Sequence, residues 1–271
     1  MEKSPISVVV LAKNEQANLP RCLNALGWAD EVVVVDDQSE DETARIANEL
    51  GARVLQHPFE SFAKQRNWAL REGDLRNEWV LLLDADEVST PEFAAEVTAQ
   101  TVSADRETVA LKTCRKTMMD GKWLRYSDGF PVWIMRVVRR GQAWFEDSGH
   151  GEVPMPKLDG SYGEISEPFL HFPFSRGMDD WWRRHTLYAG REARKELARA
   201  DGEPFSSLLR MNASCRRRAI RRLSASLPAR GSLRFFYQYI LKRGFLDGRA
   251  GYRFCRMMAC YESMIAIRKM D

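Results

Sequence analysis

The sequence predicts an α/β fold in which helices flank a mostly parallel sheet. Four apolar runs, each of strand length and most of them rich in β-branched residues, recur in the first hundred residues. They occupy residues 6–12, 31–35, 53–56 and 79–83. Strands that are apolar on both faces and separated by helices form parallel sheets with right-handed crossovers.

The segments between these strands carry helix signals. Asn18 is a candidate N-cap with Pro20 in the first turn. Ser39 and Glu42 have the spacing of a capping box. Further helices are expected at 62–71, 90–101 and 179–200.

Three regions follow from these patterns. Residues 1–110 form the α/β half, in which strands and helices alternate. Residues 111–178 have short strand and loop signals rich in Gly, Pro and aromatic residues, and we expect them to cover the open side of the sheet within the same domain. Residues 179–271 are expected to be helical.

Composition excludes several classes of protein. The chain has 271 residues, 44% hydrophobic and 29% charged, which excludes disordered, collagen-like and disulfide-stapled proteins. No apolar run approaches the ~18 residues of a membrane-spanning helix, and no secretory signal is visible. Five scattered cysteines without a CxxC motif are typical of reduced thiols in the cytosol.

Charge is distributed unevenly along the chain. The net charge is only +3, but residues 205–271 contain 15 Lys or Arg and three acidic residues. Such a segment favours polyanions, namely lipid headgroups, lipid-linked phosphates or nucleic acid. Aromatic and aliphatic side chains among the arginines favour an anionic membrane, with Phe235, Phe236, Tyr239 and Ile240 on an interfacial helix. Helices packed on the body with a solvated basic face are the alternative.

An acidic cluster follows the strand at 79–83. Asp84 and Asp86 would lie on one side of the extended chain, where their carboxylates suit a hard divalent cation. A solvated loop is the alternative for any isolated DxD tripeptide. A ligand site is favoured because ligands bind at the carboxyl ends of parallel strands, and a second acidic cluster occupies an equivalent end.

That second cluster is Asp36-Asp37, after the strand at 31–35. One carboxylate can accept the imide N–H of uracil or ribose hydroxyls, while the other can cap the next helix. Neither the G-x-G-x-x-G pattern of dinucleotide binders nor a P-loop is present, which argues against an NAD or FAD enzyme.

Four motifs taken in order resemble glycosyltransferase family 2. They are ISVVVLAKNE at 6–15, VVVVDDQSED at 32–41, AKQRNWA at 63–69 and LLLDADE at 81–87. The DADE form, together with 168–171 and 239–251, is similar to the lipopolysaccharide-core β-1,4-glucosyltransferase branch.

The resemblance implies a GT-A fold and an inverting transfer from a nucleotide-sugar, usually UDP-linked, with Mg²⁺ or Mn²⁺. Residues 1–110 would then bind the nucleotide-sugar and 111–178 would face the acceptor. Asp86 is expected to be the main metal contact, with Asp84 beside it. The positions carried over to nucleotide-sugar binding are Leu11, Lys13, Asn14, Glu15, Asp36, Asp37, Arg66, Asn67, Asp84 and Asp86.

Inversion also needs a carboxylate that takes the proton of the acceptor hydroxyl. Relatives often have His-Glu at the position where this chain has His150-Gly-Glu152. The base therefore stays open among Glu152, Asp147 and Glu146. His150 either orients a carboxylate or a phosphate or is a plain loop histidine.

The expected function is transfer of a hexose, glucose by resemblance, from a UDP-sugar to a lipopolysaccharide-core or other glycolipid acceptor. The expected location is the cytoplasmic face of the inner membrane, held peripherally by the basic helices of 205–271. Transfer to a polyprenyl phosphate is the first alternative, since a phosphate nucleophile needs no base. A non-catalytic protein that binds RNA or lipid through a vestigial nucleotide fold is the second, and a nucleotidyltransferase the third. Nucleic acid is not the expected partner.

Overall fold

The computed structural model describes residues 3–148, 151–156, 159–200 and 229–270. The chain divides into two compact units. The sheet unit comprises residues 1–123 and 130–176, and the helical unit comprises 124–129 and 177–271. The chain therefore leaves the sheet unit after Trp123, contributes six residues to the helical unit, and returns at Phe130.

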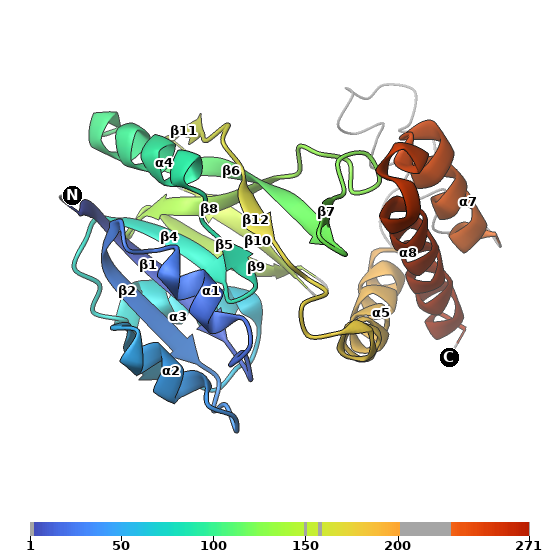
Figure 1. The fold of residues 1–271 in the computed structure, drawn as a ribbon, viewed down its shortest axis with the longest axis horizontal. Coiled ribbons are helices and arrows are strands. Elements are labelled where there is room, and N and C mark those ends of the chain that lie inside the picture. Colours follow the sequence, from blue (N-terminus) through green and yellow to red (C-terminus); the bar gives the residue numbers. More distant parts are fainter. Residues whose placement is uncertain (1–2, 149–150, 157–158, 201–228, 271) are drawn as a thin grey trace. The chain divides into compact units, whose positions relative to one another are not determined.

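The sheet unit is built mainly from strands (Figure 1). In chain order they are β1 (Ser4–Ala12), β2 (Ala29–Asp36), β3 (Arg53–Gln56), β4 (Trp79–Asp84), β5 (Glu87–Val88), β6 (Thr108–Met119), β7 (Lys122–Trp123), β8 (Trp133–Arg139), β9 (Ala143–Ser148), β10 (Gly151–Pro156), β11 (Ser161–Glu164) and β12 (Phe169–His171). Its helices are α1 (Leu19–Asn24), α2 (Thr43–Glu49), α3 (Phe62–Glu72) and α4 (Pro91–Ser103).

The main sheet has the strand order β3-β2-β1-β4-β8-β6-β12-β5. Strand β1 pairs in parallel with both β2 and β4. Strand β8 lies antiparallel between β4 and β6, while β11 and β12 run parallel to β6. The predicted α/β class with a GT-A-type, mostly parallel sheet flanked by helices is therefore confirmed. A separate hairpin of β9 and β10 is antiparallel.

Both faces of the sheet are covered, which explains why its strands are apolar throughout. Ile6, Val8 and Val10 of β1 belong to the core that contains side chains of α1 and α4. Val9 and Leu11 alternate with them and belong to the core that contains side chains of α3. Burying each such side chain contributes roughly 1.5–3 kcal/mol.

Two local expectations were wrong. Ser39 and Glu42 do not form a capping box: α2 begins at Thr43, and Ser39 instead hydrogen-bonds to Asp36. The Thr43 N–H at the start of α2 donates to the Asp41 carboxylate, so Asp41, and not Ser39, accepts from a backbone N–H of this helix. The region after residue 110 was expected to cover the open side of the sheet with short strands. Instead, the 12-residue β6 and the adjacent β8 belong to the main sheet itself.

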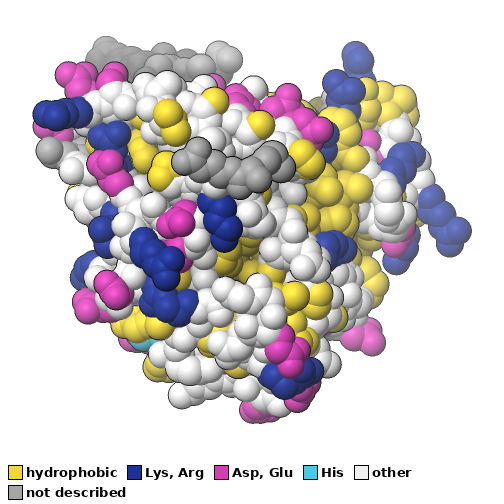
Figure 2. Space-filling model, turned by 60° about the vertical axis from the view of Figure 1, so that its left-hand side comes forward, with side chains coloured by type: hydrophobic (Ala, Val, Ile, Leu, Met, Phe, Trp, Pro, Cys, Tyr) yellow, Lys and Arg dark blue, Asp and Glu magenta, His cyan; other side chains and the backbone are white. Residues whose placement is uncertain are grey.

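The helical unit contains α5 (Met178–Ala200), α7 (Arg230–Phe236), a π-helical turn η2 (Tyr237–Leu241), a 3₁₀ turn η3 (Gly244–Asp247) and α8 (Gly248–Arg268). No helix among the described residues is both long and apolar enough to span a membrane. The arginine-rich segment 216–222 lies outside the described residues. On the face shown in Figure 2, basic and acidic side chains are intermingled.

Buried Asp247 explains part of the 239–251 motif. Its Oδ2 accepts from the backbone N–H groups of Tyr126 and Ser127 at 3.0 and 2.7 Å, and from the Ser127 hydroxyl at 2.6 Å. Gly244 packs so closely that an added Cβ would lie 2.7 Å from the Gln238 carbonyl oxygen. The motif thus fastens residues 124–129 to the helices of this unit.

Candidate functional site

The two acidic clusters follow β2 and β4, the two strands that pair with β1 on either side. In the parallel register, Leu11 of β1 lies beside Asp84 of β4, and Ala12 lies beside Asp36 of β2. Beyond the strands, the Asp37 N–H donates to the Ala12 carbonyl at 2.9 Å. Asp36-Asp37 and Asp84-Ala-Asp86 therefore flank β1 at the carboxyl edge of the sheet, where ligands of parallel sheets bind.

Asp36 holds the loop after its own strand. It is buried, its Oδ1 accepts from the Ser39 hydroxyl, and its Oδ2 accepts from the Ser39 N–H and from Nε2 of Gln56 at 3.1 and 2.7 Å. Both carboxylate oxygens are thus engaged within the protein. This leaves Asp37 as the carboxylate of the pair that can meet a ligand.

Asp37 is part-exposed and lies beside Lys13. Its Oδ1 accepts from the Phe59 N–H at 2.9 Å, while its Oδ2 lies 3.8 Å from Nζ of Lys13. Lys13 also donates to the Asp37 and Gln38 carbonyls at 2.5 and 3.0 Å. Leu11, the third residue expected near a base, packs in the core beside α3.

Asn14 and Glu15 link the loops that follow β1 and β2. Asn14 adopts a left-handed conformation with φ of 52°, and its Oδ1 accepts from the Glu40 N–H at 2.8 Å. The Glu15 N–H donates to the Thr43 hydroxyl at 2.7 Å, and its carboxylate pairs with Arg176 at 2.8 Å. Their contacts shape the edge of the site rather than leave their side chains available to a ligand.

A buried charge cluster forms the centre of the site. Arg66 of α3 donates from Nη2 to Oδ1 of Asp84 at 2.8 Å and from Nε to Oε1 of Glu152 at 2.6 Å. Arg136 of β8 donates from Nη2 to Oδ2 of Asp84 at 2.9 Å and to Oε1 of Glu87 at 3.0 Å, and its Nη1 lies 3.5 Å from Glu152. Two guanidinium groups thus bind three carboxylates from three separate strands.

The cluster changes the acidity of its members. Burial alone would raise the pKa of Asp84, but the charges of Arg136 and Arg66 outweigh burial and hold this pKa well below its ordinary value. Burial raises the pKa of Glu87 even though Arg136 opposes the shift. Burial would lower the pKa of Arg136, yet the surrounding carboxylates raise it. Asp84 and Arg136 are therefore firmly charged.

Two buried donors in the cluster remain unsatisfied. Within the described residues, Nη1 of Arg66 and Nε of Arg136 have no hydrogen-bond acceptor. Arg66 is only 1% exposed, and a buried donor that has no acceptor costs about 1–3 kcal/mol of folding free energy. Such donors are usually satisfied by a ligand, an ion or water.

The hairpin of β9 and β10 brings part of the predicted catalytic set to this cluster. Asn67 fastens the hairpin to α3, because its side chain donates to the Phe145 carbonyl and accepts from the Phe145 N–H at 2.8 and 2.9 Å. Glu152 pairs across the hairpin with Asp147, so both lie on one face. Glu146 alternates to the other face. His150 lies outside the described residues.

Asp86, the other carboxylate of the DxD motif, lies beside a histidine. Its Oδ2 is 3.7 Å from Nε2 of His171, and the two side chains are 16% and 15% exposed. Strand β12 is held here because His171 pairs with Glu87 of β5 and the Phe172 N–H donates to the Asp86 carbonyl at 2.9 Å.

The donor set fits a divalent cation that is shared with a ligand. Both oxygens of Asp84 accept from arginines, whereas Oδ2 of Asp86 lies 3.7 Å from Nε2 of His171, so these two side chains place an oxygen and a nitrogen close together. Among the described residues, no group of three or more His, Cys, Asp or Glu side chains is arranged to hold a metal. Mg²⁺ is commonly bound by one or two carboxylates together with substrate phosphates and water, and Asp86 suits that part.

Arg136, Glu87 and His171 were missed as site residues by the sequence interpretation. Arg136 stands in an apolar strand, Trp-Ile-Met-Arg-Val-Val-Arg, where an isolated arginine indicates a buried counter-charge. The apolar surroundings of Arg136 were visible in the sequence, but they did not identify which carboxylates pair with it. His171 belongs to the 168–171 segment of the resemblance, but it was interpreted as a partly buried histidine, because its relation to Asp86 depends on the pairing of β12 with β5.

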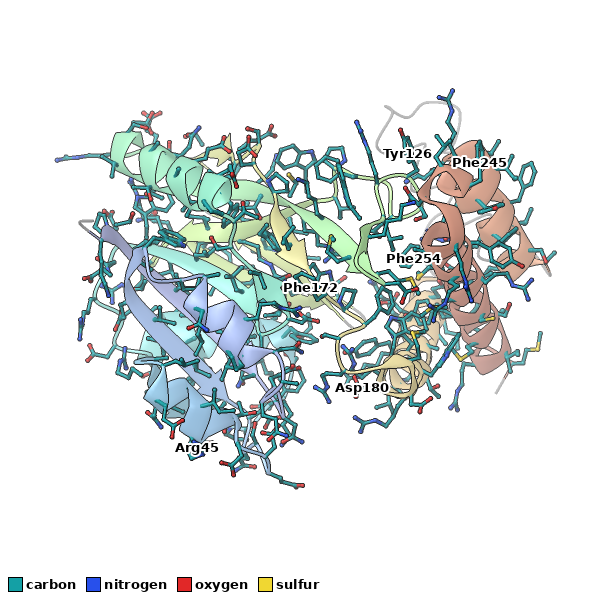
Figure 3. The ribbon with its side chains drawn as sticks, viewed as in Figure 1. Arg45, Tyr126, Phe172, Asp180, Phe245 and Phe254 are labelled. Atoms are coloured by element: carbon teal, nitrogen blue, oxygen red, sulfur yellow. The ribbon has the colours of Figure 1, made fainter. Side chains whose placement is uncertain are left out.

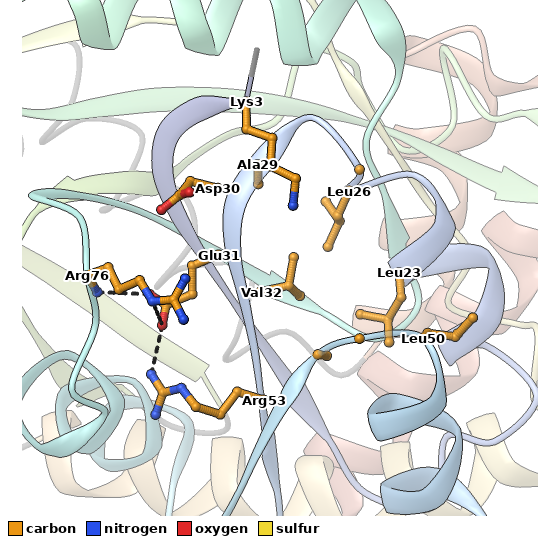
Figure 4. A pocket seen from close by; sticks show the side chains of 13 residues that line it. Lys3, Leu23, Leu26, Ala29, Asp30, Glu31, Val32, Leu50, Arg53 and Arg76 are labelled. Carbon is orange, nitrogen blue, oxygen red and sulfur yellow. Dashed lines mark hydrogen bonds and ion pairs between the residues drawn. The ribbon is translucent and has the colours of Figure 1, made fainter. Parts of the chain in front are cut away.

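A cavity of about 180 Å³ lies at the opposite, amino ends of the strands (Figure 4). Leu23, Leu26 and Leu50 form its apolar side, and buried Glu31 pairs there with Arg53 at 2.9 Å. None of the predicted site residues lines it. The chemistry of the carboxyl edge therefore does not extend to this cavity.

Comparison with known proteins gives matches of three kinds. Residues 7–156 match the family model described as "Glycosyl transferase family 2". An "Uncharacterized glycosyltransferase" of Rickettsia felis is 40% identical over 98 residues, which are 36% of this chain and 33% of that protein. The "Lipopolysaccharide core biosynthesis glycosyltransferase LpsC" of Rhizobium meliloti is 26% identical over 179 residues, 63% of this chain and 64% of the relative.

One similar solved structure is glucosyl-3-phosphoglycerate synthase of Mycobacterium tuberculosis in complex with Mn²⁺, UDP and glucosyl-3-phosphoglycerate. It is 16% identical, with a TM-score of 0.47, over 74% of this chain and 82% of that one. The chain matches only about a third of the length of the Rickettsia relative.

Proposed function

The chain belongs to glycosyltransferase family 2, and we propose that it transfers a hexose, glucose in this proposal, from a UDP-sugar to a lipopolysaccharide-core or other glycolipid acceptor. The observation that carries the proposal is that Asp37, Asp84 and Asp86 lie at the carboxyl ends of the two strands that flank β1, with two buried arginines bound to Asp84. The LpsC relative supports the choice of acceptor class.

The nucleotide would bind along the ends of β1, β2 and β4. Asp37 is the carboxylate available to accept the imide N–H of uracil, with Lys13 beside it. Arg66 would lie beside the diphosphate, since its buried Nη1 lacks an acceptor in the described part of the chain. An anionic oxygen at this position would satisfy the donor and strengthen it through charge.

A divalent cation, Mn²⁺ or Mg²⁺, would be held by Asp86 and His171. When bound, such a cation neutralises the negative charge that develops on a departing diphosphate. Asp84 would contribute through the arginines that it orients, because both of its oxygens already accept from guanidinium groups.

The base that takes the acceptor proton would come from the hairpin of β9 and β10. Glu152 lies in the charge cluster, where Arg66 and Arg136 engage it, and Asp147 lies opposite on the same face of the hairpin. Oε1 of Glu152 contacts these two arginines, so this oxygen is already engaged within the protein. We therefore place Asp147 before Glu152, and both before Glu146.

Asp86→Ala tests the proposal most simply. Sugar transfer, or slow hydrolysis of UDP-glucose without acceptor, should require Mn²⁺ or Mg²⁺ and should fall at least ~100-fold in this variant. Glu72→Ala, an exposed carboxylate on α3, is the matched control and should keep full activity. Metal-dependent activity at wild-type level in Asp86→Ala would contradict the metal assignment.

Transfer to a polyprenyl phosphate is the alternative reaction, and it is favoured by the contacts of Glu152, whose carboxylate is already bound by Arg66 and Arg136. A polyprenyl phosphate attacks through an oxygen that is already ionised and needs no base. Transfer that survives the combined Glu146→Gln, Asp147→Asn and Glu152→Gln substitutions would favour that acceptor, whereas loss in Asp147→Asn alone would favour a sugar hydroxyl. The amide variants keep the shape of each side chain.

A membrane location completes the proposal. Acceptors anchored in lipid require the enzyme to work at the surface of a membrane, and we propose the cytoplasmic face of the inner membrane with peripheral attachment. The basic residues of 205–271 supply the charge for this attachment. Sedimentation of the protein with anionic membranes that is reversed by salt is the expected behaviour.

A further inference from the structure

Helix α7 and the π-helical turn η2 expose an apolar stripe. The stripe consists of residues spaced three or four apart on one helical face, and each is at least 42% exposed: Leu233, Phe236, Tyr237, Ile240 and Leu241. A helix of a globular protein normally turns such a stripe toward the core. Here the stripe faces outward.

The opposite face of the same helix makes the packing contacts. Gly231 lies so close to α8 that an added Cβ would be 2.6 Å from the Ala259 carbonyl oxygen. Gln238 is 3% exposed and donates to the Ser127 carbonyl at 3.0 Å. The helix is therefore docked through a glycine and a polar amide, while its apolar side chains are left outside.

The stripe continues onto η3 and α8. Phe245, Leu246 and Tyr252 are each 43–49% exposed. Tyr239 joins the segments, since its ring lies 6.2 Å from that of Phe245 and 5.6 Å from that of Tyr252. In Figure 3, Phe245 marks this surface, whereas Phe254 of α8 is buried. We call the eight exposed residues of Leu233–Tyr252 the α7–η3 surface.

The concentration of apolar side chains here is unusual for this chain. Of the 18 large hydrophobic residues that are exposed among the described residues, eight lie in Leu233–Tyr252 and six in the whole sheet unit. Single exposed hydrophobic residues need no explanation, but a gathered set marks an interaction site. The α7–η3 surface is therefore a candidate for contact with a partner.

Charge identifies the kind of partner. The same segment contains four basic residues, Arg234, Lys242, Arg243 and Arg249, and one acidic residue. The acidic residue, Asp247, is buried, so the exposed charge is positive. Cations around exposed aromatic and aliphatic side chains are the composition of helices that lie in the interface of an anionic bilayer.

We propose that the α7–η3 surface binds an anionic phospholipid bilayer, with its apolar side chains among the lipid headgroups and acyl chains and its arginines at phosphate level. The inference deepens the proposed function, which requires the enzyme to reach acceptors held in lipid. Long basic side chains suit this arrangement because their stems stay in apolar surroundings while their charges remain hydrated.

Vesicle flotation with the full chain tests the proposal. Wild-type protein should float with vesicles of phosphatidylcholine and phosphatidylglycerol and not with phosphatidylcholine alone. Phe236→Ser with Leu241→Ser should weaken binding at least tenfold, and Arg243→Glu with Arg249→Glu should do the same. Val102→Ser, which changes a residue 67% exposed on α4, is the matched control and should bind as wild type.

The proposal would be overturned by a lack of binding to anionic vesicles, by unchanged binding in the apolar double variant, or by a wild-type dimer that the same variant dissociates. Salt-sensitive RNA binding in place of vesicle binding would also overturn it. Hydrolysis of UDP-glucose in solution separates this proposal from the proposed function. The apolar variant should keep that hydrolysis, whereas a wild-type protein that floats but never turns over a UDP-sugar would contradict the function alone.

Discussion

The sheet unit places charge where proteins usually place apolar groups, and the helical unit does the reverse. Arg66 and Arg136 are 1% and 8% exposed in a cluster of carboxylates at the carboxyl edge of the sheet. In the helical unit, Leu241 and Phe236 are 62% and 52% exposed, while the amide of Gln238 is buried. Burial alone would favour apolar side chains inside and charged or polar side chains outside, and both units depart from that arrangement.

The difference separates two kinds of recognition. Buried ion pairs lose much of their attraction to desolvation, so they stabilise a fold little and are better explained by the ligand they prepare for. An exposed apolar stripe gains nothing until something covers it. The sheet unit is thus suited to a small, highly charged ligand, and the helical unit to an extended surface.

Removing Arg136 should give the largest effect on stability. Arg136→Met leaves Asp84 and Glu87 in a buried site with one counter-charge fewer, which should cost about 3–5 kcal/mol. Urea unfolding at pH 7 and at pH 5 measures this, and the deficit should be smaller at pH 5, where Glu87, whose pKa is raised by burial, takes up a proton more readily. Arg45→Met removes an exposed arginine with two ion pairs and should leave the unfolding midpoint unchanged. Equal midpoints for both variants would contradict the account of the cluster.

Asp247 should be the corresponding residue in the helical unit, with a smaller effect. Asp247→Ala leaves the Tyr126 and Ser127 N–H groups without their acceptor, at about 1–3 kcal/mol for each buried donor. Ser127→Ala removes a single hydrogen bond and should cost only about 1 kcal/mol. Thermal unfolding followed by circular dichroism compares the two variants. A larger loss in Ser127→Ala would show that Asp247 is not the anchor.

The smallest effect concerns pH and a carboxylate of α5. Burial opposes ionisation of Glu196, but hydrogen bonds and charge from Arg230 and Lys269 lower its pKa below the ordinary value. A lowered folded-state pKa gives stability that is present above the unfolded pKa of about 4.3 and is lost as pH falls through the folded value. Glu196→Gln should therefore cost less than about 1 kcal/mol at pH 7 and nothing at pH 2. A cost that persists at pH 2 would mean that packing, and not charge, is lost.

The sequence was sufficient for the strand ends but not for the partners of their side chains. Apolar runs predicted β1, β2 and β4, and the rules of parallel sheets predicted that Asp37 and Asp86 would share an edge. Which oxygens remain available depends on contacts between distant segments, such as Arg136 with Asp84 across 52 residues. Pattern alone contains no such information.

The helical unit shows the same limit in another form. The sequence predicted a basic amphipathic helix with Phe235, Phe236, Tyr239 and Ile240 at an interface, but periodicity does not say which side packs on the protein. Phe236 and Ile240 are exposed, whereas Phe235 stacks on Tyr239 at 5.1 Å. Gly231 and Gln238 determine which side of the helix packs. The glycine allows close approach to α8, and the Gln238 amide donates to the Ser127 carbonyl.

The central claim is that the carboxyl edge binds a cation together with a nucleoside diphosphate. Calorimetric titration of UDP into wild-type and Asp86→Asn protein, with and without Mn²⁺, tests it directly. Because the proposed site contributes only Asp86 and His171 from the described residues, Mn²⁺ alone should bind weakly. Mn²⁺ should raise the affinity for UDP at least tenfold in wild type and leave it unchanged in Asp86→Asn. UDP binding that is indifferent to Mn²⁺ in the wild-type protein, or equally enhanced in Asp86→Asn, would contradict the claim.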